Sequence, residues 1–436
     1  MSDYMFMLES HVTPDQARAV TQVQAAAADV NVNLFLTGGA MRDMIAGFPI
    51  RDLDFTVEGA ALKVGKALAA RHGAEISSID ESRKTIDLLF PGDVTVEIGM
   101  ARRERYSKPG ARPVVHAATM HEDLTGRDFT INAIALSLNR ASRGLLIDPT
   151  NGLADIEHKE LRAVSNYTLY DDPSRILRLI RLKVRLGYAI AERTMMQYQN
   201  VREAGLENKI PAEALGRELR HIANDPNSGD ILHALEEEKL LRLFSPALTG
   251  SNLNLSALVK LQKARQMLPF GAEFPVKNMP LLLYFLAEKL SPKDRAALVK
   301  TCALAKPEVS AWQKLEPSSR KLEKQLKSAK LQRPSHLYAL LSKAPGEDIL
   351  FLLVKSSERI VLDRIKNYLQ KYLPAAQEIT DKDLEGAGGQ PGTPKGAKLK
   401  SELIAKRLDS RPKKVPLPAE ETASTPAAAP VRGARG

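Results

Sequence analysis

Two aspartates separated by a single residue, Asp52 and Asp54, are the side chains in this sequence that point most directly to chemistry. They lie in residues 52–57, where polar and apolar residues alternate as in a half-buried strand. Because alternate side chains of a strand share one face, the two carboxylates are expected to lie side by side and to repel each other. A cation between them removes that repulsion, and hard cations such as magnesium prefer oxygen ligands. The pair therefore predicts a metal site.

The residues in front of this pair predict a site for phosphate. An apolar run at residues 34–36 ends at Gly38 and Gly39, and a helix of about two turns is expected to follow. Glycine lets the backbone approach a phosphate closely, and the free N–H groups at a helix N-terminus point toward it. Arg42 on this helix could reach a phosphate; the alternative is an ion pair with the neighbouring Asp43. Each signal alone is weak, but a phosphate site beside a two-carboxylate metal site is what nucleotidyl transfer requires.

A second group of polar residues opens another expected helix. Asp172 precedes it, and Arg175, Arg178 and Arg181 recur at every third position, so the arginines share one broad face. An enzyme that works without a template must read the incoming base with its own side chains. An aspartate accepts from the exocyclic amine of cytosine or adenine, and an arginine donates to the neighbouring ring acceptor, whereas guanine and uracil have the wrong polarity. The alternative is that Asp172 caps the helix beside a solvated basic stripe.

The composition permits several domains and a polyanionic partner. The chain has 436 residues and a formal net charge of +11, which leaves room for roughly two to four domains. Cys302 is the single cysteine, so no internal disulfide and no cysteine metal cluster are expected, and a reducing cytoplasm fits. The N-terminus lacks the apolar core of a signal peptide, and no run approaches the ~18–20 apolar residues of a membrane span. No stable protein partner is predicted.

Four segments follow one another along the chain: residues 34–59, 127–133, 145–162 and 171–181. In this order they resemble the motifs of the polymerase-β-type nucleotidyltransferases, and within them the class II tRNA nucleotidyltransferases (CCA-adding enzymes) and the bacterial poly(A) polymerases. The resemblance covers roughly residues 30–230 and, weakly, the tail. It implies an α/β nucleotidyltransferase head with a polymerase-β-like mixed sheet, followed by an all-α neck, body and tail. It also implies that the protein adds C, A or both from CTP and ATP to the 3′ acceptor end of tRNA, with Mg²⁺ as cofactor and release of pyrophosphate.

The resemblance gives roles to individual residues. Asp52 and Asp54 match the catalytic carboxylates, which hold two magnesium ions. The residues that match nucleotide contacts are Gly39 and Arg42 for the phosphates, Arg127 for the nucleotide, Asp172 and Arg175 for the base, and Arg178 and Arg181 for further nucleotide and phosphate contacts.

Two positions qualify this assignment. The family usually has a double arginine where this chain has Gly126 and Arg127, so one positive charge is missing. Glu97, in the third of three strands expected between residues 74 and 100, can supply a third carboxylate. An ion pair with Arg102 or Arg103 is an equal alternative, and Glu97 stays outside the predicted site.

Residues 128–138 predict a helix with an apolar face, and residues 102–113 predict a mobile basic loop.

The expected domains are a catalytic head over 1–150, a helical neck over 151–225 with the base-reading residues, and a helical body over 226–375. An RNA-binding tail over 376–411 and a disordered C-terminus over 412–436 follow. Trp312 is expected to pack between helices and not to stack on a base. The tail predicts a basic amphipathic helix after a glycine-rich turn, and its residues expected to meet RNA phosphates are Lys395, Lys398, Lys400, Lys406 and Arg407.

Three alternatives to full CCA addition stay open. The base-reading pair accepts both C and A, so an enzyme that adds only CC or only A, or a poly(A) polymerase, has the same motifs. An arginine-rich segment that marks the poly(A) group is not clear in residues 76–90, which favours tRNA. A rival of another class is an inactive RNA-binding protein with the same fold, which would bind RNA in EDTA and incorporate nothing.

Overall fold

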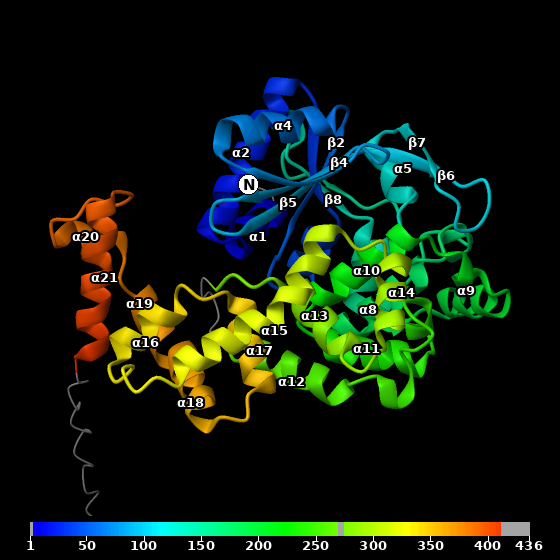
Figure 1. Cartoon of the computed structure of the whole chain (residues 1–436). Helices are drawn as coiled ribbons and strands as arrows, with labels where there is room; N and C mark the ends of the chain where they lie inside the picture. The colour runs from blue at the N-terminus through cyan, green and yellow to red at the C-terminus, as the bar shows by residue number, and fades with distance from the viewer. Residues whose placement is uncertain (1–2, 269–273, 411–436) are drawn as a thin grey trace, which may run out of the picture.

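A mixed β-sheet forms the N-terminal part of the protein, as a computed structural model that describes residues 3–268 and 274–410 shows (Figure 1). The seven strands lie in the order β3-β4-β5-β2-β1-β8-β9. β2 and β5 are parallel, and the other neighbouring strands are antiparallel. The strands are β1 (Asn33–Thr37), β2 (Leu53–Glu58), β3 (Glu75–Asp80), β4 (Thr85–Phe90), β5 (Val94–Met100), β8 (Ala135–Ser137) and β9 (Leu146–Ile147).

Helices cover one face of this sheet and leave the other for polar residues. On β2, Leu53, Phe55 and Val57 are fully buried, and Asp54 and Thr56 lie between them on the opposite face, as alternation requires. α4 packs on β4 and β5 and also contacts α2. The helices of this part are α1 (Asp3–His11), α2 (Pro14–Val30), α3 (Gly38–Ile45), α4 (Ala61–His72) and α5 (Met120–Thr125).

Two elements differ from the sequence-based expectations. The helix expected over residues 128–138 is a short 3-10 turn, η1 (Thr130–Asn132), followed by strand β8. Residues 133–136 are completely buried, and a continuous apolar run does not distinguish a buried strand from a helix. The basic loop expected over 102–113 begins a two-stranded hairpin of β6 (Arg102–Arg105) and β7 (Val114–Ala117), and all four residues of β6 are charged.

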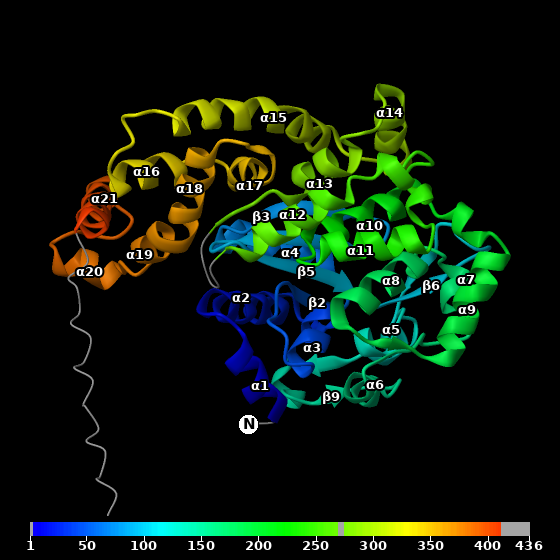
Figure 2. The same ribbon diagram turned by 90° about the horizontal axis from the view of Figure 1, so that it is seen from below.

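Beyond β9, the described residues form helices joined by turns and loops, with one two-residue pairing of β10 (Glu160–Leu161) with β11 (Ala189–Ile190). This confirms the predicted fold class. Figure 2 shows α15 to α21 arching away from the sheet. Trp312 packs against the hydrophobic core from α15, as expected. The helices are α6 (Gly152–His158), α7 (Thr168–Asp171), α8 (Arg175–Leu186), α9 (Glu192–Glu203), α10 (Ala212–Asn224), α11 (Ser228–Glu237), α12 (Leu255–Gln266), α13 (Asn278–Ala287), α14 (Pro292–Thr301), α15 (Lys306–Leu326), α16 (Pro334–Leu341), α17 (Gly346–Lys355), α18 (Arg359–Asn367), α19 (Leu373–Gln377), α20 (Asp381–Gly386) and α21 (Pro394–Asp409).

The expected tail helix is confirmed as α21, which follows a turn of several glycines. The domain boundaries remain predictions, and the disorder expected over 412–436 lies outside the described residues. No helix in the described part of the chain has both the length and the apolar character to cross a membrane.

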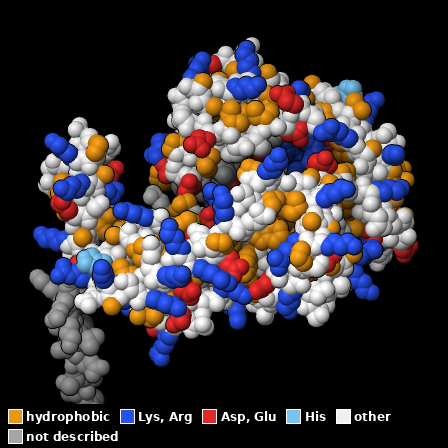
Figure 3. Space-filling view, in the orientation of Figure 1, with side chains coloured by type: hydrophobic (Ala, Val, Ile, Leu, Met, Phe, Trp, Pro, Cys, Tyr) orange, Lys and Arg blue, Asp and Glu red, His pale blue; other side chains and the backbone are white. Residues whose placement is uncertain are grey.

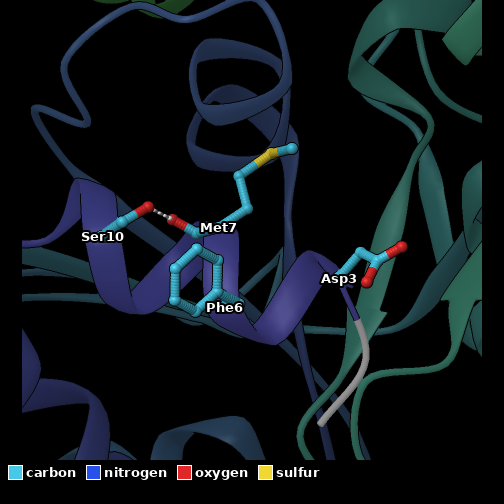
Figure 4. A pocket seen from close by; sticks show the side chains of 4 residues that line it. All are labelled: Asp3, Phe6, Met7 and Ser10. Atoms are coloured by element: carbon cyan, nitrogen blue, oxygen red, sulfur yellow. Dashed lines mark hydrogen bonds between the residues drawn. The ribbon is translucent and has the colours of Figure 1, made fainter.

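Two surface hollows lie away from the predicted site residues. One, of about 580 Å³, is on α1 and is lined by Asp3, Phe6, Met7 and Ser10; there the Ser10 hydroxyl donates to the Met7 carbonyl (Figure 4). The other, of about 520 Å³, lies between the body and the tail, and Tyr338, Tyr368 and Lys400 are among its lining residues. Neither is lined by a residue expected to bind the nucleotide or the metal.

Candidate active site

Asp54 lies where strand β2 meets the N-terminus of helix α3. The Ala40 backbone N–H donates to its Oδ2 at 3.2 Å. A Cβ at Gly38 would lie 3.1 Å from that oxygen, and one at Gly39 3.0 Å, so glycine permits the close approach of the turn to the carboxylate. Gly38 also has φ of +61°, which favours glycine. Burial and the nearby charges of Glu97 and Asp52 raise the pKa of Asp54 to about 7.

Asp52 stands beside Asp54 but outside the strand. β2 begins at Leu53, and the Asp52 side chain is exposed and accepts a hydrogen bond from the Thr95 hydroxyl on β5. The strand was therefore expected to start one residue too early. The charge of Asp52 is one of the causes of the raised pKa of Asp54.

Glu97 is the third carboxylate at this place. It lies directly opposite Asp54 in the register of the parallel pair β2 and β5. Arg102 pairs with Glu104 and Arg103 with Glu122, so neither forms the ion pair with Glu97 that the sequence left open. Burial and the charge of a neighbouring aspartate on β4 raise the pKa of Glu97.

The donor set limits what a cation could find here. Among residues 3–268 and 274–410, no group of three or more His, Cys, Asp or Glu side chains is arranged as a metal site. A pair of carboxylates fits Mg²⁺ nevertheless, because this ion commonly takes its remaining oxygens from water and from substrate phosphates. The excess negative charge around Asp54 is consistent with a cation bound there.

Arg42 is not free in this structure. Its side chain is buried, its Nε donates to Asp43 Oδ1 at 2.8 Å, and its Nη1 donates to Asn132 Oδ1 at 2.7 Å. The ion pair with Asp43, which was the alternative to a phosphate contact, is thus present, but it is buried and does not lie on the surface. Asp43 also pairs with Arg185 of α8. A phosphate contact from Arg42 remains a prediction.

Arg127 lies beside the glycine turn. Its Nη2 donates to the Thr56 hydroxyl at 2.9 Å and its Nε to Asp123 Oδ2 at 2.8 Å. A Cβ at Gly38 would be 3.5 Å from its Nη1. The structure therefore brings Arg127 together with Asp54, as the assignment to a nucleotide contact requires.

The predicted base-reading pair lies between α7 and α8. Asp172 Oδ1 accepts from the backbone N–H of Ser174 at 3.0 Å, which is close to the capping role considered as its alternative. Its Oδ2 lies 3.9 Å from Arg175 Nε, and Arg175 Nη1 donates to the Thr168 carbonyl at 3.3 Å. Only 16% of the Asp172 side chain and 12% of the Arg175 side chain are exposed.

Arg178 and Arg181 are held by carboxylates that the sequence reading did not pair with them. Glu218 of α10 binds Arg178 at 3.1 Å and Arg181 at 3.2 Å. Asp128 binds Arg178 from the head. These charges hold the pKa of Asp128 well below its ordinary value and lower that of Glu218 to about 2, in spite of burial. Sequence reasoning could have found Glu218, because a glutamate on the apolar face of an amphipathic helix is buried and needs a charged partner.

Replacement of Glu218 by glutamine is expected to lower the free energy of unfolding by about 3 kcal/mol at pH 7, because it leaves a buried arginine without its partner. The folded pKa of about 2 lies below the value of 4.5 for an unperturbed glutamate. The stabilisation is therefore complete above pH 4.5 and is lost as the pH falls toward 2. Urea unfolding at pH 7 and pH 3.5 measures it, with the exposed Glu213→Gln on the same helix as control. An equal loss at both pH values would contradict the ion-pair account.

The β6–β7 hairpin reaches the base-reading pair from the head. The Gly110 backbone N–H donates to the Asp171 carbonyl at 3.2 Å. The Tyr106 hydroxyl donates to Glu104 Oε2 at 2.6 Å, and burial together with the charges of Glu104 and Asp172 raises the pKa of Tyr106. The segment expected to be a mobile loop is thus docked on the neck.

Alanine at position 110 is expected to undock the hairpin. Gly110 has φ of +71°, and a Cβ there would overlap the backbone carbonyl of Lys209. Trypsin cleavage after Arg105, the exposed last residue of β6, should then become about tenfold faster, since such strain costs about 1–3 kcal/mol. Gly47→Ala is the matched control, because Gly47 has φ of +76° and nothing within 4 Å of the added Cβ. Cleavage rates that rise equally in both variants would mean that the contact with Lys209 does not matter.

Comparison with known proteins identifies this arrangement. The poly A polymerase head domain matches residues 34–162, which include Asp52, Asp54 and Arg127. The chain is 30% identical over 380 residues to an A-adding tRNA nucleotidyltransferase of Aquifex aeolicus, an alignment that covers 85% of this chain and 45% of the relative. Residues 34–162 thus have the poly A polymerase head domain, and the chain as a whole is similar to tRNA nucleotidyltransferases.

Members of this family with different names resemble the chain. An A-adding tRNA nucleotidyltransferase of Halalkalibacterium halodurans is 28% identical over 396 residues, 89% of this chain and 88% of the relative. A CC-adding tRNA nucleotidyltransferase of Deinococcus radiodurans is 31% identical over 234 residues, 51% of this chain and 61% of the relative. The chain spans less than half the length of the Aquifex relative but most of the length of the Halalkalibacterium relative.

A solved structure of this family has the same fold. It is described as the apo form II of a CCA-adding enzyme, and it aligns with 95% of this chain and 96% of its own length at a TM-score of 0.53. Because the sequence identity is 24%, the likeness concerns the fold alone. It agrees with the mixed-sheet head and helical remainder seen here.

Proposed function

We propose that this protein is a template-independent tRNA nucleotidyltransferase, which transfers C, A or both from CTP and ATP to the 3′ end of tRNA. The observation that carries the proposal is a chain of contacts between the two predicted halves of the site. Arg127 donates to the Asn132 carbonyl at 3.2 Å, the Asn132 amide donates to Asp128 at 3.0 Å, and Asp128 binds Arg178. Because Arg127 also donates to the Thr56 hydroxyl on β2, this network connects strand β2 with helix α8, the two elements that carry the predicted residues Asp54 and Arg175.

In the proposed reaction the 3′-hydroxyl of the RNA attacks the α-phosphate of the nucleotide, and pyrophosphate leaves. Asp52 and Asp54 would hold Mg²⁺. When bound, this ion would lower the pKa of the hydroxyl and neutralise charge on the phosphates. Gly39 allows the backbone to come close to the triphosphate, and Arg127 donates to the nucleotide. With the hydroxyl activated in this way, the reaction requires no separate general base.

Base selection is assigned to the neck. Asp172 accepts from the exocyclic amine that cytosine and adenine share, and Arg175 donates to the adjacent ring nitrogen. This pair favours CTP and ATP over UTP and GTP but does not choose between C and A. Relatives named for adding A and for adding CC both resemble the chain, so the number and kind of nucleotides added must be measured.

Three tRNA transcripts test the function directly: one that ends before CCA, one after the first C and one after CC. Each is incubated with Mg²⁺ and labelled CTP or ATP, and the product lengths are read on a gel. Extension of all three to CCA supports a CCA-adding enzyme, whereas addition of A to the CC end alone supports an A-adding enzyme. Long A ladders on any RNA identify a poly(A) polymerase. Binding without incorporation in any case overturns the proposal in favour of an RNA-binding protein.

The proposed place of action is the cytoplasm, with which the buried, single Cys302 agrees.

The tail helix α21 is proposed to bind tRNA phosphates. Lys400 pairs with Asp381 and Arg407 with Glu378, while the exposed Lys395, Lys398 and Lys406 hold no ion pair in the part of the chain that the structure describes.

Changing these three lysines to alanine is expected to weaken tRNA binding and to reduce the slope of log Kd against log salt by about 2–3. Fluorescence anisotropy of labelled tRNA between 50 and about 200 mM salt measures the slope. The matched control replaces three exposed lysines of α15, which are Lys314, Lys321 and Lys324. Equal slopes for the tail variant and the wild type would place the RNA elsewhere.

A further inference from the structure

One asparagine at the site binds a cation and an anion at the same time. Asn132 ends the short turn η1 and is half-buried. Its Oδ1 accepts from Arg42 Nη1 at 2.7 Å, and its Nδ2 donates to Asp128 Oδ1 at 3.0 Å. An arginine offers only donors and a carboxylate only acceptors, so the amide fits between them in one orientation. A side chain that offers acceptors alone or donors alone could not join this pair.

Arg42 is the partner whose direction matters for a ligand. Only 5% of its side chain is exposed, so few of its N–H groups can meet anything outside the protein. Asp43 Oδ1 lies 2.8 Å from its Nε and 2.7 Å from its Nη2, and Asn132 takes one N–H of Nη1. Among the residues that the structure describes, this leaves one N–H on each terminal nitrogen without an acceptor. Asp43 and Asn132 thus hold the guanidinium from two sides.

The terminal nitrogens of Arg42 lie at the glycine turn before α3. The point that a Cβ on Gly39 would take is 3.4 Å from Arg42 Nη2, 3.9 Å from its Nη1 and 3.0 Å from Asp54 Oδ2. A phosphate oxygen that comes close to this backbone therefore meets the guanidinium beside the carboxylate proposed to hold the metal. Figure 3 shows Lys and Arg side chains gathered in the hollow between the sheet and the helices below it, a surrounding that suits an anion.

We infer that Asn132 is a positioning residue for the phosphates of the nucleotide, because it holds the Arg42 guanidinium at the glycine turn. This inference rests on the proposed function, since the nucleotide is the molecule that brings phosphates to this turn. Asn132 is itself held by Asp128, which binds Arg178 of α8. The direction of Arg42 in the head is thereby tied to a helix of the neck, and Asn132 acts through Arg42.

Binding to the full-length protein tests this role. In Asn132→Ala the Kd for ATP and the Kd for inorganic pyrophosphate, both measured by calorimetry with Mg²⁺, are expected to rise about tenfold, the loss typical of one hydrogen bond to a charged group. Pyrophosphate has no base, so an equal rise for both ligands assigns the effect to the phosphates. The KM for CTP and ATP should rise likewise, while kcat changes by less than about threefold. The Kd for tRNA in EDTA should stay within about twofold.

Thr130→Val is the matched control for a general loss of stability. Thr130 lies in the same turn, and its buried hydroxyl donates to Asp155 of α6 at 2.6 Å and not to Arg42. This variant should lower the midpoint of thermal unfolding but leave the Kd for pyrophosphate within about twofold. Asn132→Ser keeps one hydroxyl and should raise that Kd by about threefold, which preserves the test if alanine is not tolerated. An equal rise in Thr130→Val and Asn132→Ala would make Asn132 merely structural and overturn the inference.

Combination with Arg42→Ala decides whether Asn132 acts through Arg42. If it does, Asn132→Ala causes no further loss of pyrophosphate affinity in the Arg42→Ala protein, whereas additive losses would overturn the inference. If the wild type incorporates no nucleotide but the two substitutions remain coupled in pyrophosphate binding, the proposed function fails and the positioning role stands. Incorporation by the wild type, with unchanged ligand affinity in Asn132→Ala, would leave the function and refute the role. A wild type that binds neither ligand would overturn both.

Discussion

Asp54→Asn is expected to reduce nucleotide incorporation by about 10³-fold or more while leaving tRNA binding intact. The carboxylate is buried beside Asp52 and Glu97, and its charge is what would hold the metal ion. Loss of several kcal/mol of transition-state stabilisation corresponds to about this factor. The amide keeps the size of the side chain, so the Ala40 N–H still has an acceptor. Single-turnover incorporation with saturating tRNA measures the rate.

Asp93→Asn is the matched control for this experiment. Asp93 is an exposed aspartate in the turn before β5, with φ of +56°, a conformation that asparagine tolerates. Its replacement should leave the rate within about twofold. Asp52→Asn should behave like Asp54→Asn. Incorporation by Asp54→Asn at the wild-type rate would refute metal-assisted nucleotidyl transfer at this site.

Asp172→Asn is expected to change which nucleotides the enzyme accepts. The asparagine side chain presents an N–H₂ group where the aspartate presented only acceptors, so it no longer favours the exocyclic amine of C and A. The value of kcat/KM for CTP and ATP should fall by about 10–100-fold, the usual range for one base contact. UTP, whose O4 is an acceptor, should gain relative to CTP. Competition between the four nucleotides on one tRNA transcript measures both effects.

Asp171→Asn separates this role from a general effect of charge. Asp171 is the neighbouring aspartate, and its side chain makes no hydrogen bond or ion pair within the described residues, although its backbone carbonyl accepts from Gly110. Its replacement should leave the preference among nucleotides unchanged. An unaltered preference in Asp172→Asn would remove the base-reading role from this aspartate.

The strands around the carboxylates could be predicted because their signals are local. Alternation placed β2 to within one residue, and the helix expected after the two glycines is present as α3, which begins at the first of them, Gly38. The region after Arg127 could not be predicted in the same way. Its apolar run is buried on every side, and only the pairing of β8 with β1, about one hundred residues earlier in the chain, decides that it is a strand.

The partners of the arginines were also beyond local reasoning. The sequence predicted that Arg42 and Arg178 contact the nucleotide, and both roles stay predictions. It did not predict that Arg42 would bind Asn132, or that Arg178 would bind Asp128 and Glu218. Such pairs join residues 40 to 90 positions apart, and no spacing rule covers that range. The individual roles in nucleotide binding therefore remain predictions that the substitutions above test.

The order of strands in the sheet has a consequence for the synthesis of this protein. β1 lies between β2 and β8, with Phe35 opposite Ser137, so the sheet cannot close until the ribosome has made more than a hundred residues after β1. At that point Arg178, the ion-pair partner of Asp128, has not yet been synthesised. In a nascent chain that ends at residue 150, this carboxylate lacks its cation, and residues 128–130 lack their backbone partners at residues 162–164. The head is thus expected to become stable only when the neck emerges, and the boundary between them marks a change of architecture and not an independent folding unit.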